Sequence, residues 1–68
     1  MNYKAEGRKL RALATFKGVT LRKIAKDLGY HPAYVSNVLR GQDKSDTALH
    51  RIREYLEDQP DEFATVAA

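Results

Sequence analysis

The chain has 68 residues and no cysteine, with 43% hydrophobic and 31% charged residues and a formal net charge of +3. This length predicts a single small domain, 1–68, and the composition is that of a globular chain, without the cysteines that disulfides, thiolate catalysis and cysteine-based zinc sites require. No apolar run approaches the ~20 residues of a membrane span and no signal peptide opens the chain, so we expect a soluble cytoplasmic protein with no membrane partner.

The hydrophobic periodicity predicts an all-α fold, since no alternating strand of useful length occurs. The first helix should span about 4–17 and end at Gly18. The second should begin after Thr20, a good N-cap residue, and end at Gly29. The apolar faces of these two helices comprise Leu10, Leu13, Ala14, Leu21, Ile24, Ala25 and Leu28.

The second half of the chain predicts two more helices and a tail. A third helix should begin near Pro32, whose fixed φ suits the first helical position, and end at Gly41. A fourth should follow with Ser45 or Asp46 as its N-cap, and 57–68 should form a tail or a short fifth helix. We therefore expect a compact bundle of four to five short helices. The apolar faces of the third and fourth helices comprise Val35, Val38, Leu39, Ala48, Leu49, Ile52, Tyr55 and Leu56.

Basic residues are concentrated in the first two thirds of the chain. Residues 1–44 contain ten Lys and Arg against three Asp and Glu, a balance of +7, whereas residues 45–68 contain two against six, a balance of −4. So positive a segment favours a polyanion partner, with the acidic end facing away, over an ordinary solvated basic face. The cations of the first helix add to this field without an expected contact of their own; they are Lys4, Arg8, Lys9 and Arg11.

The most informative pattern lies in residues 20–41, where Ala25, Gly29, Val35 and Val38 have the spacing of two helices joined by a tight turn. A small side chain such as Ala25 is needed where two such helices cross closely. Gly29 accommodates the positive φ of a sharp exit from the first helix. The two valines anchor the second helix to the core, which leaves its other face outward.

From Leu10 to Leu56 the chain resembles the phage Cro and CI-type repressors, with their lambda-repressor-like helix-turn-helix, here at about 21–40. The resemblance implies a transcriptional regulator that binds double-stranded operator DNA as a homodimer, a phage or prophage Cro-type repressor in a bacterial cytoplasm or nucleoid or an infected host. Many relatives have an ion pair where Ala14 and Leu39 stand. A hydrophobic pair can replace an ion pair at little cost. Relatives also often have a DNA-contacting Gln where Leu21 stands, and that contact does not carry over.

The resemblance also places the DNA-contacting residues. Asn37 is the strongest candidate because Asn can pair bidentately with adenine. Arg22 and Lys23 stand in the first turn of a helix, where the dipole disfavours cations, and this favours phosphate contacts. Tyr30 and Tyr34 either hydrogen-bond a phosphate or cover the turn. The predicted base-contacting residues are His31, Pro32, Ala33, Ser36 and Asn37. The predicted phosphate-contacting residues are Arg22, Lys23, Tyr34, Arg40, Gln42 and Lys44.

Motifs for catalysis or metal binding do not occur in the sequence. His31 and His50 do not form a chelating pair on one helix face, and neither a glycine-rich phosphate loop nor a nucleophile motif is found. So short a chain leaves little room for a water-excluding pocket. We therefore expect no enzyme activity, no cofactor, no metal and no small-molecule ligand.

Two classes of function remain after these exclusions. The first is the operator-binding regulator. The second is a helix-turn-helix module, such as an antirepressor or antitoxin, whose main partner is another protein. The positive charge of residues 20–44 favours the first. A dimer surface is expected in the fourth helix and tail, where Tyr55, Leu56 and Phe63 are the apolar candidates.

Overall fold

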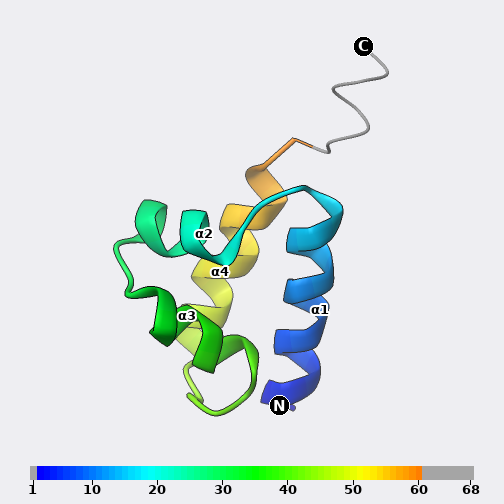
Figure 1. The fold of residues 1–68 in the computed structure, drawn as a ribbon. Coiled ribbons are helices and arrows are strands. Elements are labelled where there is room, and N and C mark those ends of the chain that lie inside the picture. The colour runs from blue at the N-terminus through cyan, green and yellow to red at the C-terminus, as the bar shows by residue number, and fades with distance from the viewer. Residues whose placement is uncertain (1, 61–68) are drawn as a thin grey trace.

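The computed structural model describes residues 2–60 and folds them into four α-helices, without a strand in that range (Figure 1). The all-α prediction is thus confirmed. The fourth helix ends at Asp58, two residues inside the predicted tail 57–68. Residues 61–68, which hold most of the possible fifth helix, lie outside the described residues. The helices are α1 (Tyr3–Phe16), α2 (Leu21–Leu28), α3 (Pro32–Leu39) and α4 (Asp46–Asp58).

All four helices begin at a side-chain N-cap, and the caps of α1, α2 and α4 share one geometry. Asn2, Thr20 and Ser45 each accept a hydrogen bond from the backbone N–H three residues ahead, at 3.0–3.1 Å. A cap of this kind stabilises a helix by about 1 kcal/mol relative to Ala. The Thr20 prediction is confirmed, and Ser45 is the N-cap of the two residues considered for α4. The Asn2 cap also explains why α1 begins at Tyr3, one residue earlier than expected.

Gly29 ends α2, as the sequence predicts. Its φ is +77°, a left-handed conformation that L side chains rarely adopt. A Cβ built at this position would meet nothing within 4 Å, so the turn requires glycine for its backbone conformation and not for space. The N–H of the next residue, Tyr30, donates to the Ala25 carbonyl at 2.8 Å, and this bond helps to cap the C-terminal end of α2.

The hydrophobic core lies between the four helices and includes Ala14 and Leu39, two of the three positions that depart from the pattern of the resembled repressors. Ala14 and Leu39 are 2% and 1% exposed, which confirms that this apolar pair belongs to the core. Several residues expected in the core instead lie half-buried at its edge: Leu13, Leu21, Leu28 and Tyr55. The buried hydrophobic residues of the described chain are Leu10, Ala14, Ile24, Ala25, Val35, Val38, Leu39, Ala48, Leu49, Ile52 and Leu56.

The expected dimer surface on α4 needs correction. Leu56 is 0% exposed because it packs into the core, so it offers no apolar area to a second molecule. Tyr55 is half-buried, and its hydroxyl donates a hydrogen bond to Asp27 at 2.5 Å. Phe63 lies outside the described residues.

Candidate nucleic-acid interface

α2 and α3 pack against each other and are joined by only three residues, 29–31. Arg51 of α4 contacts this turn. It donates from Nη1 to the Tyr30 hydroxyl at 2.9 Å and from Nη2 to the Leu28 carbonyl at 3.2 Å, and its guanidinium lies 4.9 Å from the centre of the Tyr30 ring. The Tyr30 ring meets the Tyr34 ring edge to face, with 5.1 Å between centroids. Tyr30 therefore packs against the turn, one of the two roles expected for it, and a phosphate contact stays a prediction.

His31 begins α3 as its N-cap, a role that sequence reasoning missed. Its Nδ1 accepts a hydrogen bond from the Ala33 N–H at 3.1 Å, and Pro32 follows in the first helical position as predicted. An accepting Nδ1 leaves Nε2 as the protonated nitrogen of the neutral ring. Histidine is not among the preferred capping residues, so only its place directly before Pro32 pointed to this contact. The side chain is exposed.

The outer face of α3 carries the predicted base-contacting residues. Val35 and Val38 are fully buried on the opposite face, as expected. Pro32 and Ala33 are exposed, whereas the other two predicted residues of the helix, Ser36 and Asn37, are half-buried. The structure therefore gathers these side chains, together with His31, on one surface of a single short helix.

The first turn of α2 forms part of a shallow hollow of about 370 Å³ that also reaches its middle. Lys23 is not the uncompensated cation that the sequence indicated, because its Nζ lies 3.6 Å from an oxygen of Asp27, one helical turn further along. Within residues 2–60, Arg22 has no such partner. The dipole argument for phosphate contacts thus applies to Arg22 more than to Lys23. The hollow is lined by Thr20, Arg22, Lys23, Lys26 and Asp27.

Asp27 and Tyr55 connect α2 to α4 through their short hydrogen bond. The bond from Tyr55 lowers the pKa of Asp27, and the charge of Lys23 adds to that effect. Burial raises the pKa of Tyr55 to about 12, and the hydrogen bond to Asp27 adds to it. At neutral pH the pair is therefore a carboxylate that accepts from a protonated phenol.

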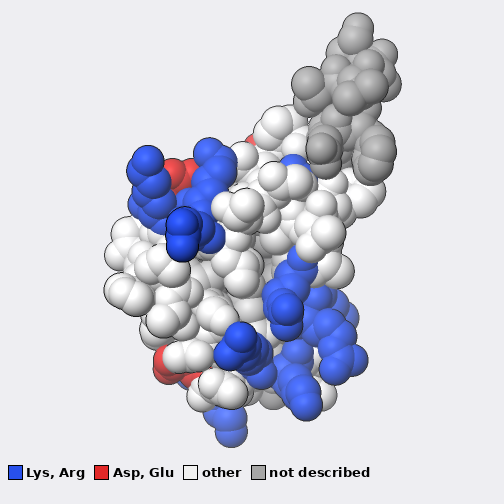
Figure 2. Space-filling model, in the orientation of Figure 1, with Lys and Arg blue, Asp and Glu red and all other residues white. Residues whose placement is uncertain are grey.

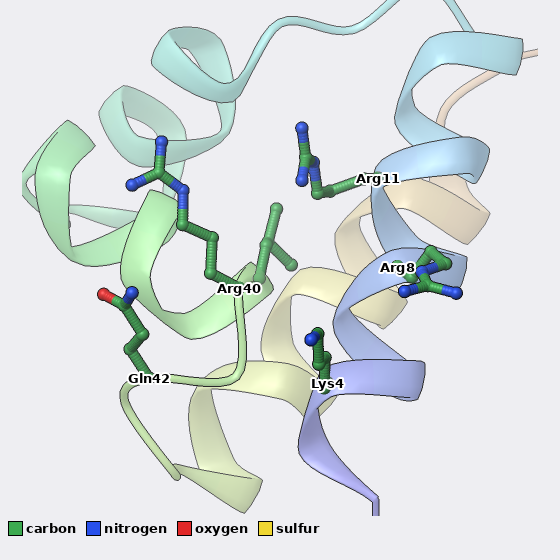
Figure 3. A pocket seen from close by; sticks show the side chains of 6 residues that line it. Lys4, Arg8, Arg11, Arg40 and Gln42 are labelled. Carbon is green, nitrogen blue, oxygen red and sulfur yellow. The ribbon is translucent and has the colours of Figure 1, made fainter.

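A second hollow, which we call the α1–α3 cleft, lies between α1 and the end of α3 and has a volume of about 300 Å³ (Figure 3). It brings Arg40 and Gln42, two predicted phosphate-contacting residues, next to three cations of α1 for which the sequence suggested no contact. The spacing of these three cations indicates a shared surface, because positions 4, 8 and 11 fall on one face of a helix. The cleft is lined by Lys4, Arg8, Arg11, Leu39, Arg40 and Gln42.

Two glycines bring the walls of the α1–α3 cleft together. A Cβ at Gly7 of α1 would lie 2.0 Å from the Leu39 carbonyl oxygen, so the two backbones are in direct contact. A Cβ at Gly41 would lie 2.8 Å from the Cα of Lys4, and its φ of +79° also favours glycine. Both positions need hydrogen in place of a side chain, which fixes the end of α3 against α1.

The remaining predicted phosphate-contacting residues are all at the surface. Arg40 is the C-cap of α3, and it is exposed, as are Gln42 and Lys44 in the loop that follows. Backbone N–H groups at 42 and 43 donate to the Asn37 carbonyl at 3.0 and 3.2 Å, so this loop folds back on α3. Tyr34 is half-buried beside Tyr30.

The charges have a simple arrangement on this face of the molecule. Figure 2 shows Lys and Arg side chains gathered over α2 and over α1, with largely uncharged surface over α3 between them. On α4, Glu54 lies 2.9 Å from Nε2 of His50, one helical turn earlier. In the described part of the chain, no group of three or more His, Cys, Asp or Glu could hold a metal ion, and no helix is long and apolar enough to cross a membrane.

Comparisons with family models, with curated proteins and with solved structures found no match to this chain. The surface chemistry of α1, α2 and α3 is therefore the basis on which a function is inferred. That surface combines a short, polar and neutral helix face with cations on two sides.

Proposed function

We propose that the protein binds double-stranded DNA, with α3 in the major groove, and regulates transcription as a Cro-type repressor. The observation that carries the proposal is the neutral outer face of α3 between two basic surfaces, on α2 and in the α1–α3 cleft (Figure 2). The major groove is about 12 Å wide and admits one α-helix, with a phosphate backbone along each side. Cations on both sides of an inserted helix would meet those phosphates.

The side chains of α3 suit base edges better than phosphates. Asn37 and Ser36 offer hydrogen-bond donors and acceptors, and Ala33 offers an apolar contact to a thymine methyl. None of the three is charged, so their contribution depends on which bases they meet. Arg22 on one side and Arg40 on the other would fix the position of the helix on the duplex. Specificity is thus assigned to α3 and affinity to its neighbours.

The proposal includes a homodimer on an inverted repeat. α3 has eight residues, which is about 12 Å of helix and enough for only a few base pairs. Operator readers of this type gain affinity by placing two such helices about 34 Å apart. Sedimentation of the protein on operator DNA should show two proteins per site, and one protein per site would contradict this part of the proposal.

Titration of a labelled random-sequence duplex at several salt concentrations tests DNA binding itself. Fluorescence anisotropy should show binding whose affinity falls linearly with the logarithm of salt concentration, since bound cations release counterions from DNA. Selection from a random pool should then enrich a sequence with inverted symmetry. A chain that fails to bind duplex DNA even at low salt would contradict the proposal and favour a protein partner.

A further inference from the structure

The cations of the α1–α3 cleft have no acidic partner among residues 2–60. Within the described chain, Lys4, Arg8, Arg11 and Arg40 make no ion pair and no side-chain hydrogen bond. Their neighbour Lys9, by contrast, points to a different side of α1 and lies 3.7 Å from Glu6. Holding unpaired like charges together costs free energy in the isolated protein. The arrangement is understandable if an anion enters the cleft.

We propose that the α1–α3 cleft is a second phosphate-binding surface, which holds a DNA strand on the side of α3 opposite to α2. This inference rests on the proposed function and extends it to three residues of α1. The row from Lys4 to Arg11 covers seven residues, about 10.5 Å along the helix axis. Each strand of a duplex carries one phosphate about every 3.4 Å of the duplex axis, so the row is long enough to meet more than one phosphate.

The residue types in the cleft also fit a phosphodiester strand. Most of its cations are arginines, whose planar guanidinium can donate two parallel hydrogen bonds to one phosphate. Leu39 is the one apolar residue among those that line it and is only 1% exposed, so an acidic peptide would find little apolar side-chain surface to bury there. The lining therefore favours a strand held by charge over a peptide held by burial.

The position of the cleft connects it to the proposed reading helix. Arg40 is the C-cap of α3 and Gln42 follows in the loop (Figure 3). A duplex in contact with α3 would therefore pass beside both. The backbone contacts at Gly7 and Gly41 fix α1 at this end of α3. The cations of α1 are consequently held at a set distance from the groove that α3 enters.

The test compares two variants of α1 with a matched control on the same helix. Arg8→Gln and Arg11→Gln each remove one charge from the cleft, whereas Lys9→Gln removes one charge outside it. A labelled 20-base-pair random duplex is titrated with each protein by anisotropy between 50 and 300 mM salt. Each cleft variant should reduce the salt slope of log K by about 0.9 and weaken binding roughly five- to tenfold at 0.1 M salt. Lys9→Gln should stay within about twofold of the parent, because Lys9 does not line the cleft and lies 3.7 Å from Glu6, which also binds Arg53.

Thermal unfolding of the same proteins separates a binding effect from a folding effect. Arg8→Gln and Arg11→Gln should melt no lower than the parent, since they relieve repulsion between like charges. Equal slopes for the cleft variants and Lys9→Gln would overturn the inference, while a steep slope in the parent would leave the proposed DNA binding intact. Equal losses in all three variants would also overturn it, because a diffuse field would then explain the effect. If the parent shows no salt-dependent binding, the proposed function and the inference fail together.

Discussion

The backbone of Gly7 lies directly against the carbonyl of Leu39, so closely that a Cβ at position 7 would come within 2.0 Å of the oxygen. Glycine inside a helix costs about 1 kcal/mol relative to alanine. That cost is offset here by contact between α1 and the end of α3, with the buried Leu39 side chain beneath it. The atom that an added Cβ would meet belongs to the backbone, which cannot move aside as a flexible side chain can.

Gly7→Ala should therefore destabilise the protein by about 1–3 kcal/mol, the range for overpacking, although alanine is the better helix former. Ala12→Gly, at an exposed site in the same helix, calibrates the cost of glycine alone, about 1 kcal/mol. Urea unfolding followed by circular dichroism measures both. A Gly7→Ala variant more stable than the parent would contradict the close contact. A destabilised variant should also lose affinity for DNA if the α1–α3 cleft binds it.

Asn37→Ala should discriminate base reading from positioning. On a selected operator we expect a loss of about 1–3 kcal/mol in binding free energy, and on random DNA almost none. The loop after α3 should be unaffected, because it bonds to the carbonyl of Asn37 and not to its side chain. Parallel anisotropy titrations on the two duplexes measure the difference. Equal losses on both would show that Asn37 positions the protein without reading sequence.

Arg22 and Lys23 should differ although they are neighbours. Arg22→Gln should reduce the salt slope of DNA binding by about 0.9 per subunit. Lys23→Gln should reduce it less, because Asp27 already compensates the Lys23 charge at 3.6 Å. Arg22→Gln should leave stability unchanged or raise it by a few tenths of a kcal/mol, because a cation leaves the positive end of a helix. Equal slopes for both variants, or a lower melting temperature for Arg22→Gln, would contradict this assignment.

Tyr55 should make stability decline in alkaline solution. Its folded-state pKa is raised to about 12, above the unfolded value near 10, so its contribution is complete below pH 10 and is lost as the pH rises toward 12. Tyr55→Phe should remove this contribution, and the difference in melting temperature between parent and variant should shrink across that range. Ultraviolet absorbance of the folded parent should show a tyrosine that titrates near pH 12. A pH-independent difference would indicate that the hydroxyl is not held by Asp27.

Asp27 should make the stability of the protein depend on pH in acidic solution. Its pKa is lowered in the folded state, so the stability it contributes is present above the unfolded pKa and is lost as the pH falls through the folded value. Tyr55→Phe removes the largest cause of that shift. The acid limb of its stability curve should therefore be shallower than that of the parent. Thermal melts between pH 2 and pH 6 compare the two proteins, and identical acid limbs would contradict the assignment.

The features that sequence predicted well are those set by neighbouring residues. Thr20 and Gly29 bound α2 through contacts within four residues, which a local pattern encodes. Val35 and Val38 follow from helical spacing alone. The contact of Arg51 with Tyr30 joins positions that are 21 residues apart on different elements, so no local sequence pattern predicts it. The α1–α3 cleft was missed for the same reason, since its two walls meet only in the folded chain.

The expected dimer surface on α4 shows where periodicity misleads. Leu56 was expected both on the apolar face of its helix and on a dimer surface, and burial to 0% exposure excludes the second. Tyr55, its neighbour, is half-buried because its hydroxyl reaches Asp27. Periodicity identifies which residues are apolar on one side, but not how much of that side the rest of the chain covers.

If the α1–α3 cleft binds DNA, its cations, which have no ion pair within residues 2–60, should also affect how long a copy of the protein persists. Their mutual repulsion lowers the stability of the free chain, and a bound polyanion would remove it and add its own binding free energy. Proteases act on chains that open, so free copies would be degraded faster than copies on DNA. The cellular amount of the protein would then follow the number of occupied sites, and excess copies would be cleared without a dedicated degradation signal.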